Sequence, residues 1–180
     1  MLGVEYFICS LRSQEIFANL DNISMAHNFH KKIIKSEFQE RVLEVRRVTR
    51  VVAGGKRFSF RATVVVGNGT GKVGVGVAKG LDVAAAVAKA KRQAEKRMII
   101  ISLKGGRTVP YDVEAKYSAA RVLLKPATKD HGLIAGGAAR AVLELAGVRD
   151  VSAKILGRTT NKLTNALATI EALKKCKSTS

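Results

Sequence analysis

The chain has 180 residues, 47% of them hydrophobic and 26% charged, which is a globular composition sufficient for one large or two small domains. Its 32 Lys and Arg against 14 Asp and Glu leave a net charge of +18, which calls for an anionic partner such as nucleic acid or an anionic membrane. The membrane is disfavoured because no apolar run approaches the about 20 residues of a spanning helix, and the basic residues are not confined to one amphipathic segment.

The N-terminal residues 1–36 are expected to form a flexible extension. Its apolar start carries Glu5 and Glu15, and it lacks the basic start and the small-residue cleavage site of a secretory signal. The acidic residues also argue against an organellar transit peptide. Met25 is a candidate for an alternative start of translation.

An N-terminal domain is expected over residues 37–101. Residues 37–50 begin with a helix-like pattern and end as a strand, and Gly54-Gly55 mark a loop. From residue 57 to 66 polar and apolar residues alternate as in a strand, and Asn68-Gly69 then predicts a tight turn into a returning strand. Strands bounded by glycines and rich in Lys and Arg are typical of a hairpin held against a polyanion.

The two faces of this hairpin are expected to differ. The apolar side chains of its first strand share one face, namely Phe58, Phe60, Ala62, Val64 and Val66. With an even-residue loop, Val73 of the return strand would lie on that same face. The other face would then show Arg61, Thr63 and nearly bare backbone at Gly74 and Gly76, open to RNA or to another backbone. Alternatively, these glycines only accommodate twist or a bulge.

Asp82 is a plausible N-cap for a helix that ends at about Met98. Its predicted apolar stripe consists of Val83, Val87, Ala90, Ala94 and Met98. Lys89, Arg92 and Lys96 fall on the far side, where a basic helix face is either merely solvated or binds RNA.

A C-terminal domain is expected over residues 102–175, followed by a tail at 176–180. The junction is placed within residues 99–110, which hold a second Gly-Gly pair and a proline. The expected elements are strands at 109–114 and 119–125, a loop at 132–137, a helix at 138–146, a strand at 151–156 and a helix marked by Leu163, Leu167, Ile170 and Leu173. This β-β-α-β-α unit of about 70 residues is marginal alone and should pack on its neighbouring domain or on a partner.

Two glycine motifs are weighed against nucleotide binding. Gly69, Gly71 and Gly74 match GxGxxG, but a strand follows instead of the helix that a dinucleotide site needs. Gly71-Lys72 resembles the end of a phosphate-binding loop, yet Val73 stands where Ser or Thr would bind magnesium. Gly136-Gly137 before the predicted helix either presents backbone N–H groups to a phosphate or only packs that helix closely.

Metal, redox and catalytic sites find little support. His27 and His30 have metal-like spacing without further ligands, and His131 stands alone. Cys9 and Cys176 form no CxxC pair, which favours a reducing cytosol without a disulfide framework. With three Tyr, six Phe and no Trp, the chain has few side chains that could stack on bases. We therefore expect it to recognise the phosphates and the shape of RNA.

The order of motifs resembles the bacterial type of the small-subunit ribosomal protein S5 family. In the first half the similar runs are RVTRVVAGGK at 47–56, FSF at 58–60 and VVGNGTGKVG at 65–74. In the second half they are KPA at 125–127, GLIAGGA at 132–138, RAVLE at 140–144 and AGV at 146–148. The resemblance covers about residues 37–173, most of the chain.

This resemblance implies an α+β fold with two domains. The first would be similar to double-stranded-RNA-binding folds, with the order α-β-β-β-α, and the second would be of the S5 domain-two type, with the order β-β-α-β-α. The family implies a cytoplasmic, non-enzymatic component of the small ribosomal subunit without cofactor or metal. It would bind 16S rRNA, contact ribosomal proteins S4 and S8, line the mRNA entry side and influence translational accuracy.

The residues expected to contact RNA lie on the hairpin and the helix after it: Arg46, Arg47, Arg50, Gly54, Gly55, Lys56, Arg57, Arg61, Lys72, Lys89, Arg92 and Lys96. In the family, the positions matching Arg47 and Arg50 face entering mRNA, and the loop matching 54–56 is where spectinomycin-resistance changes cluster. The chain departs from the family pattern at Ala53, where many members have Lys, at the additional cation Arg57, and in the absence of Asn-Pro before the last helix.

Two rival functions remain at this stage. One is a free-standing double-stranded-RNA-binding module outside the ribosome. The other is a nucleotide-dependent enzyme, which only the glycines and fold analogy of the second half suggest.

Overall fold

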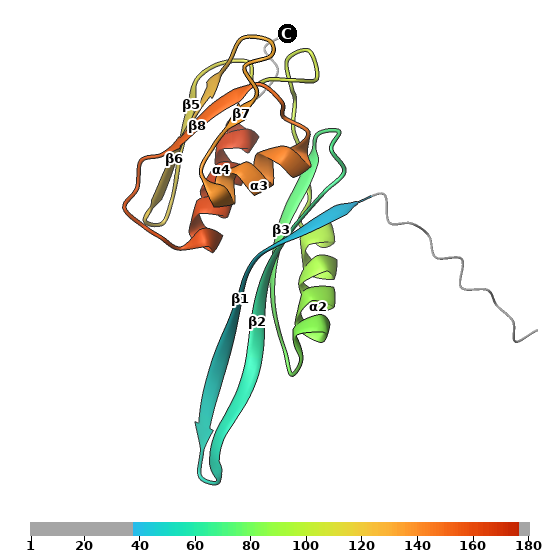
Figure 1. Ribbon diagram of the computed structural model, residues 1–180, viewed down its shortest axis with the longest axis vertical. Coiled ribbons are helices and arrows are strands. Elements are labelled where there is room, and N and C mark those ends of the chain that lie inside the picture. The colour runs from blue at the N-terminus through green and yellow to red at the C-terminus, as the bar shows by residue number, and fades with distance from the viewer. Residues whose placement is uncertain (1–37, 177–180) are drawn as a thin grey trace, which may run out of the picture. The chain divides into compact units, whose positions relative to one another are not determined.

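The computed structural model describes residues 38–176, which form two mixed α+β domains (Figure 1). The predicted extension at 1–36, with Met25, Cys9, His27 and His30, lies outside the described residues, as does the end of the tail. The two-domain α+β fold class is confirmed. None of the described helices is long and apolar enough to cross a membrane.

The N-terminal domain is an antiparallel sheet with the strand order β1-β2-β3-β4 and one helix on it. Its elements are β1 (Gln39–Val52), β2 (Gly55–Gly67), β3 (Lys72–Gly80), α2 (Val83–Lys96) and β4 (Ile99–Ile100). The predicted strands after the Gly-Gly loop and the predicted N-cap at Asp82 are confirmed, since the Asp82 carboxylate accepts a hydrogen bond from the Val83 N–H at 2.7 Å.

The helix-like start predicted for residues 37–50 is wrong. Gln39–Val52 is a strand that pairs with β2 along its length, from Gln39 opposite Gly67 to Val52 opposite Gly55, with a bulge after Val42. Pairing with a long valine-rich neighbour outweighs the modest helix propensity of the Glu, Gln and Leu residues here. Within residues 38–176 no helix precedes β1, so the first helix of the predicted α-β-β-β-α order is not among the described elements.

The predicted coincidence of the Phe/Val face with the Val73 side is also wrong. Gly67 lies opposite Val73, which leaves an odd number of residues between them. The Asn68 side chain closes this longer loop by accepting hydrogen bonds from the Thr70 and Lys72 N–H groups at 2.9 and 3.0 Å. As a result Val64 lies opposite Gly76, and the glycines share the face of the even-numbered apolar residues.

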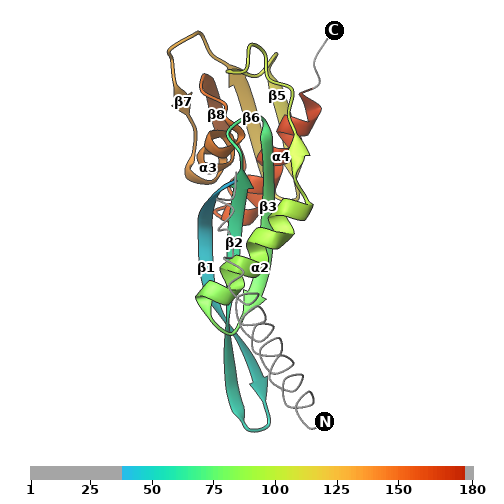
Figure 2. The ribbon, with the colours of Figure 1, turned by 90° about the vertical axis from the view of Figure 1, so that its right-hand side faces the viewer.

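Helix α2 packs on this glycine-containing face (Figure 2). Its fully buried residues are Ala86, Ala90 and Ala94, four positions apart. A Cβ atom at Gly76 would lie 2.1 Å from the Ala90 carbonyl oxygen, and one at Gly74 would lie 2.4 Å from that of Ala94. The glycines therefore allow the helix backbone to pack directly on the sheet. Of the alternatives for Gly74 and Gly76, the structure shows close approach of another backbone, that of α2.

The apolar stripe predicted for α2 is only partly correct. Ala90 and Ala94 are buried as predicted, and Val87 and Met98 are partly buried against the same cluster. Val83 remains 37% exposed, because the row of buried residues on α2 begins one turn later, at Ala86. Small alanines face the glycines, so close backbone contact replaces the larger side chains that the sequence pattern favoured.

The C-terminal domain has a four-stranded sheet with the order β5-β6-β8-β7, in which β7 runs parallel to β8. Its elements are β5 (Val113–Tyr117), β6 (Ala120–Pro126), β7 (Leu133–Ile134), α3 (Gly137–Ala146), β8 (Val151–Ile155) and α4 (Lys162–Lys175). The predicted strand at 109–114 begins only at Val113, and Val109 is fully buried although it lies outside the sheet. The predicted loop at 132–137 contains the short β7.

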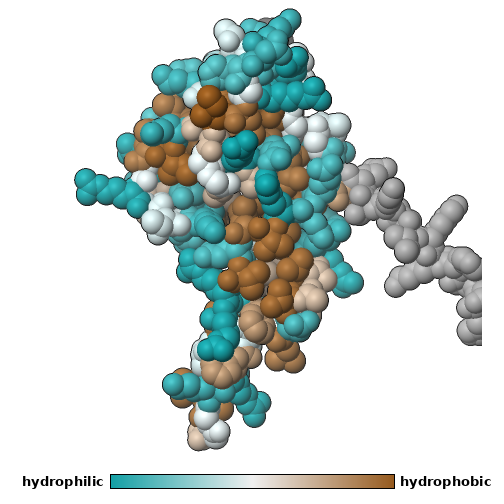
Figure 3. Space-filling model, viewed as in Figure 1, coloured by the Kyte–Doolittle hydropathy of each residue, from teal (hydrophilic) through white to brown (hydrophobic). Residues whose placement is uncertain are grey.

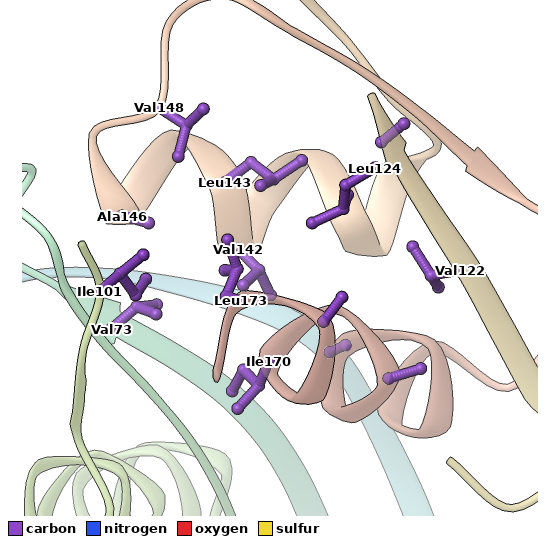
Figure 4. Packing of buried hydrophobic residues seen from close by; sticks show 14 of the residues in the cluster. Val73, Ile101, Val122, Leu124, Val142, Leu143, Ala146, Val148, Ile170 and Leu173 are labelled. Atoms are coloured by element: carbon purple, nitrogen blue, oxygen red, sulfur yellow. The ribbon is translucent and has the colours of Figure 1, made fainter. Parts of the chain in front are cut away.

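The second face of the N-terminal sheet is buried against the C-terminal domain. One cluster of buried residues contains Val73 and Ile101 together with Val142 and Ala146 of α3, which Figure 4 shows side by side. Thr63, expected on an open face, is only 3% exposed. This shared core confirms that the small C-terminal unit packs on its neighbour. Among residues 38–176 nothing packs on the same face of the sheet at the far part of the hairpin.

Candidate nucleic-acid interface

Cations lie side by side across the strands on the hairpin face opposite α2. Arg46 on β1 is paired with Arg61 on β2, and Arg61 is paired with Lys79 on β3. Four residues closer to the tip, Arg50 is paired with Arg57. Like charges directly opposite each other destabilise a sheet, so these two cross-strand rows favour an anionic ligand on this face.

Carboxylates neutralise little of this charge. Arg46 donates through Nε to the Glu44 carboxylate at 2.6 Å. In the part of the chain that the structure describes, Arg50, Arg57 and Arg61 are exposed and have no ion pair with an acidic side chain. Three guanidinium groups on one exposed ribbon present planar forks of donors that match phosphate oxygens.

The other face of the hairpin carries a second, smaller set of predicted residues. By register, Arg47 and Lys56 lie on the α2 side, and the Arg47 guanidinium stacks over the Phe58 ring at 4.4 Å from its centroid. Phe58 is 47% exposed, so this face mixes cations with apolar surface. Figure 3 shows hydrophilic and hydrophobic residues next to one another along the hairpin at the lower end of the view. The predicted Gly54-Gly55 pair lies at the tip, where Ala53 and Gly54 form the turn.

The predicted residues of α2 line a groove beside β3. Lys89, Arg92 and Lys96 lie there together with two cations that the sequence reasoning missed, Lys79 and Arg97. Lys79 can be recognised as part of this basic surface only when the β2–β3 register is known, because that register pairs it with Arg61. The groove has a volume of about 620 Å³.

Lys72 stands apart from the other predicted RNA contacts. It begins β3 and pairs with Ile100 at the end of the sheet remote from the hairpin tip. Seven residues of strand at about 3.3 Å each separate it from Lys79, or roughly 23 Å. The structure therefore does not bring Lys72 together with the cross-strand rows.

The glycine-rich loop after β2 is used inside the protein. The Gly69 N–H donates to the Leu145 carbonyl at 3.0 Å, and the Gly71 N–H donates to the Ala146 carbonyl at 2.9 Å. These carbonyls belong to the last turn of α3, where they have no partner within the helix. The backbone donors that a phosphate loop would aim at a nucleotide therefore cap α3, which agrees with the rejection of both nucleotide motifs.

The Gly136-Gly137 pair lies at the start of α3, as predicted. Gly136 is the N-cap residue, and a Cβ atom there would lie 2.9 Å from Cδ1 of Ile155. The helix packs closely against β8 here, but the neighbouring atom is the end of the Ile155 side chain, which can move aside for a Cβ atom. No described contact of Gly137 requires a glycine, since its Cβ would meet nothing within 4 Å.

The buried acid of the C-terminal domain has a structural environment. Asp150 is 2% exposed and accepts from Arg107 Nε at 3.0 Å and from the Gly132 N–H at 3.2 Å. Attraction to Asp150 raises the pKa of Arg107, which also donates to Asp130 at 3.2 Å. Within residues 38–176 no group of three or more His, Cys, Asp and Glu is placed to hold a metal ion.

Comparisons with known proteins match both halves of the chain. The family model described as "Ribosomal protein S5, N-terminal domain" matches residues 38–102, and "Ribosomal protein S5, C-terminal domain" matches residues 115–180.

Curated relatives agree with the family models. The chain is 49% identical to small ribosomal subunit protein uS5 of Gloeobacter violaceus, over 81% of this chain and 65% of that protein. It is 48% identical to small ribosomal subunit protein uS5c of Cyanophora paradoxa, over 79% of this chain and 84% of that protein. The uS5 protein of Thermosynechococcus vestitus is 50% identical, over 77% of this chain and 79% of its own length.

Proposed function

This chain belongs to the ribosomal protein S5 family, and on that premise we propose that it is a structural constituent of the small ribosomal subunit that binds 16S rRNA through its β1–β2 hairpin. The family consists of ribosomal structural proteins and not of enzymes, so no catalytic residue is assigned. The nucleotide-dependent enzyme therefore has no support beyond its glycines, which the fold uses for packing.

The pairing of cations across β1, β2 and β3 is the observation that supports this proposal most directly. Arg46, Arg61 and Lys79 lie abreast, with Arg50 and Arg57 nearer the tip. In the free protein these pairs repel each other, and the phosphate backbone of RNA would relieve that repulsion. Contacts of this kind position the protein on RNA and read its shape.

The finer features of the proposal come from the family resemblance. Arg47 and Arg50 would face mRNA at its entry side, and the tip at 54–56 would influence translational accuracy. Ribosomal proteins S4 and S8 would be the protein neighbours, and the complex would be cytoplasmic. The tip carries Ala53 instead of the frequent Lys, and Arg57 on β2 restores a cation close to it.

A salt titration with a structured 16S rRNA fragment tests the electrostatic part. Neutralising six to ten phosphates predicts that affinity falls by about 10³–10⁵ between 50 and 200 mM salt. In the variant Arg50→Gln/Arg57→Gln, the slope of log affinity against log salt should shrink by about 2, with about tenfold weaker binding for each arginine replaced.

The matched control is Lys116→Gln/Lys154→Gln, which removes two exposed cations from the C-terminal sheet and changes the net charge equally. The control should keep most of the salt slope if the hairpin makes the contacts. A flat salt response of the unaltered chain, or equal losses in both variants, would contradict the hairpin as the RNA interface.

Sucrose-gradient fractionation of cells tests the ribosomal part. Co-sedimentation of the chain with the small subunit, retained through a wash in moderate salt, is the expected result. Its absence from that fraction, together with tight binding to free duplex RNA, would favour the free-standing RNA-binding module.

A further inference from the structure

The side of the hairpin that continues the α2 face of the sheet is open near the tip. Strand β3 follows β2 only as far as Phe60, which pairs with Gly80, so among the described residues β1 and β2 alone form the ribbon beyond that pair. By register, five exposed side chains share this side of the ribbon, here called the Phe58 face: Arg47, Thr49, Val51, Lys56 and Phe58.

The centre of the Phe58 face is apolar and lies in water. Phe58 is 47% exposed and Val51 is 73% exposed, whereas Val64 and Val66 on the same side of β2 are fully buried. Packing of Phe58 against its cross-strand partner Thr49 stabilises the ribbon, but it leaves about half of the phenylalanine side chain accessible. The exposed ring is therefore available to a ligand.

The Arg47 side chain adds a second planar group to this face. Its guanidinium lies over the Phe58 ring, 4.4 Å from the ring centroid. Planar guanidinium groups stack on aromatic rings, and both kinds of plane stack on unpaired RNA bases. Because the two side chains already contact each other, a base that stacks on this pair finds it largely pre-organised.

Cations flank the Phe58 ring along the ribbon. Arg47 lies opposite Phe60, two residues to one side of Phe58, and Lys56 lies two residues to the other side. At about 3.4 Å per residue, each is displaced by about 7 Å along the strands. Neither cation forms an ion pair with a carboxylate of residues 38–176. A nucleotide strand has the complementary order, since each base lies between two phosphates.

We propose that the Phe58 face binds an unpaired RNA base, which stacks on the Arg47–Phe58 pair while its neighbouring phosphates contact Lys56 and the edge of the Arg47 guanidinium. This inference rests on the proposed RNA-binding function and specifies the RNA that the hairpin binds. That RNA is a loop, a bulge or a single strand, because the bases of an uninterrupted duplex are stacked on each other.

An unpaired base suits this face better than an apolar protein surface. The core of a protein interface is depleted of charged residues, whereas two of the five side chains here are cations. The opposite face of the same ribbon carries Arg50 and Arg57, and the two strands are only about 4.8 Å apart. The phosphates of the same RNA segment therefore find cations on the Phe58 face and along the edges of the ribbon.

Removal of the base from the RNA tests the stack directly. The full chain is titrated with a short RNA stem-loop, with the same stem-loop carrying abasic nucleotides in its loop, and with a blunt duplex of equal length. Stacking of one base predicts about 5- to 100-fold tighter binding of the intact loop than of the abasic loop. In Phe58→Leu this preference should fall to about threefold or less, while the slope of log affinity against log salt stays the same because no charge is removed.

Two further variants separate stacking from charge. Arg47→Lys keeps the charge but not the plane, so it should also lose most of the preference for the intact loop. Phe58→Tyr keeps the ring and should retain the preference. The matched control Tyr117→Leu removes a ring that is 40% exposed on the C-terminal sheet and should behave as the parent. The blunt duplex should bind the parent and Phe58→Leu equally, and all variants should keep the circular dichroism spectrum of the parent.

Equal affinity of the unaltered chain for the intact and abasic loops would overturn the stacking site, as would a full preference in Phe58→Leu. Unchanged loop preference in Phe58→Leu, together with its loss from reconstituted small subunits, would assign the Phe58 face to a protein neighbour instead. Failure of the unaltered chain to bind any of the three RNAs would refute the proposed function itself.

Discussion

Replacing Gly76 by alanine tests whether this glycine belongs to the protein core or to the RNA interface. A Cβ atom at this position would lie 2.1 Å from the Ala90 carbonyl oxygen and 2.6 Å from the Ala94 backbone nitrogen. Both neighbours are backbone atoms of a packed helix and cannot rotate away. Ordinary contact begins at 3.4 Å, so α2 must retreat by about 1 Å or more.

The magnitude follows from two opposing effects. Alanine in a strand gains about 0.5–1 kcal/mol because the unfolded chain loses conformational freedom. Overpacking a close-packed contact costs about 1–3 kcal/mol, and here it also separates Ala86, Ala90 and Ala94 from the sheet that buries them. Steric overlap therefore wins by roughly 1–2 kcal/mol, and Tm should fall by about 2–8 °C at about 2–4 °C per kcal/mol for a chain of this size.

Thermal unfolding followed by circular dichroism measures the effect, and Gly54→Ala is the matched control. A Cβ atom at Gly54 would meet nothing within 4 Å, so its Tm should stay within about 2 °C of the parent. RNA affinity of Gly76→Ala, measured well below its Tm, should match that of the parent chain. Weaker RNA binding without a loss of Tm would refute the packing account and return Gly76 to the RNA interface.

Three further substitutions or titrations test other parts of the fold. Gly147→Ala should lower Tm by more than 4 °C, because φ at Gly147 is +83° and a Cβ atom there would lie 2.0 Å from the Gly69 carbonyl oxygen in the β2–β3 loop. In the control Gly137→Ala the Cβ atom would meet nothing within 4 Å, so Tm should not change. Equal Tm values for the two variants would contradict the docking of that loop on α3. Asp150→Asn should lower the urea midpoint of unfolding, because the buried carboxylate loses its charge pairing with Arg107; an unchanged midpoint would show that the pair adds nothing to stability. Burial raises the pKa of the Cys176 thiol from 9.0 to about 11, so the folded state holds this proton more tightly than the unfolded state. The free energy of unfolding should therefore fall as pH rises from about 9 to 11, and it should fall by more in the parent chain than in Cys176→Ala. Identical dependence on pH in the two proteins would refute the effect of the buried thiol.

Local signals in the sequence predicted the elements that depend on a few neighbouring residues. The alternation in 57–66 and the N-cap at Asp82 each reflect a hydrogen bond or a face within one element. Both are present in the structure. The charge and the motif order likewise indicated a nucleic-acid partner and the family, because neither depends on how the chain packs.

Predictions failed where pairing between strands overrides local preference. The start of residues 37–50 has a helix-like pattern in isolation, but Gln39–Val52 forms β1 because β2 supplies a partner for every residue except the bulge. The hairpin parity failed because five residues, closed by the Asn68 side chain, separate the paired Gly67 and Val73, whereas a tight turn separates its pair by two. A shift of one residue moves every side chain to the other face, so a small error in the loop reversed the predicted surface.

The sequence by itself determined that this chain is basic, that it has two α+β domains and that its first domain contains a glycine-rich hairpin. Only the tertiary structure decided what the glycines do. Gly74 and Gly76 admit the backbone of α2, and Gly69 and Gly71 donate to the last turn of α3. Such contacts join residues far apart in the chain at backbone distances, and no local pattern encodes which surface will arrive there. Within residues 38–176 the same packing leaves the cations of the hairpin and of the groove exposed, on opposite faces of the sheet.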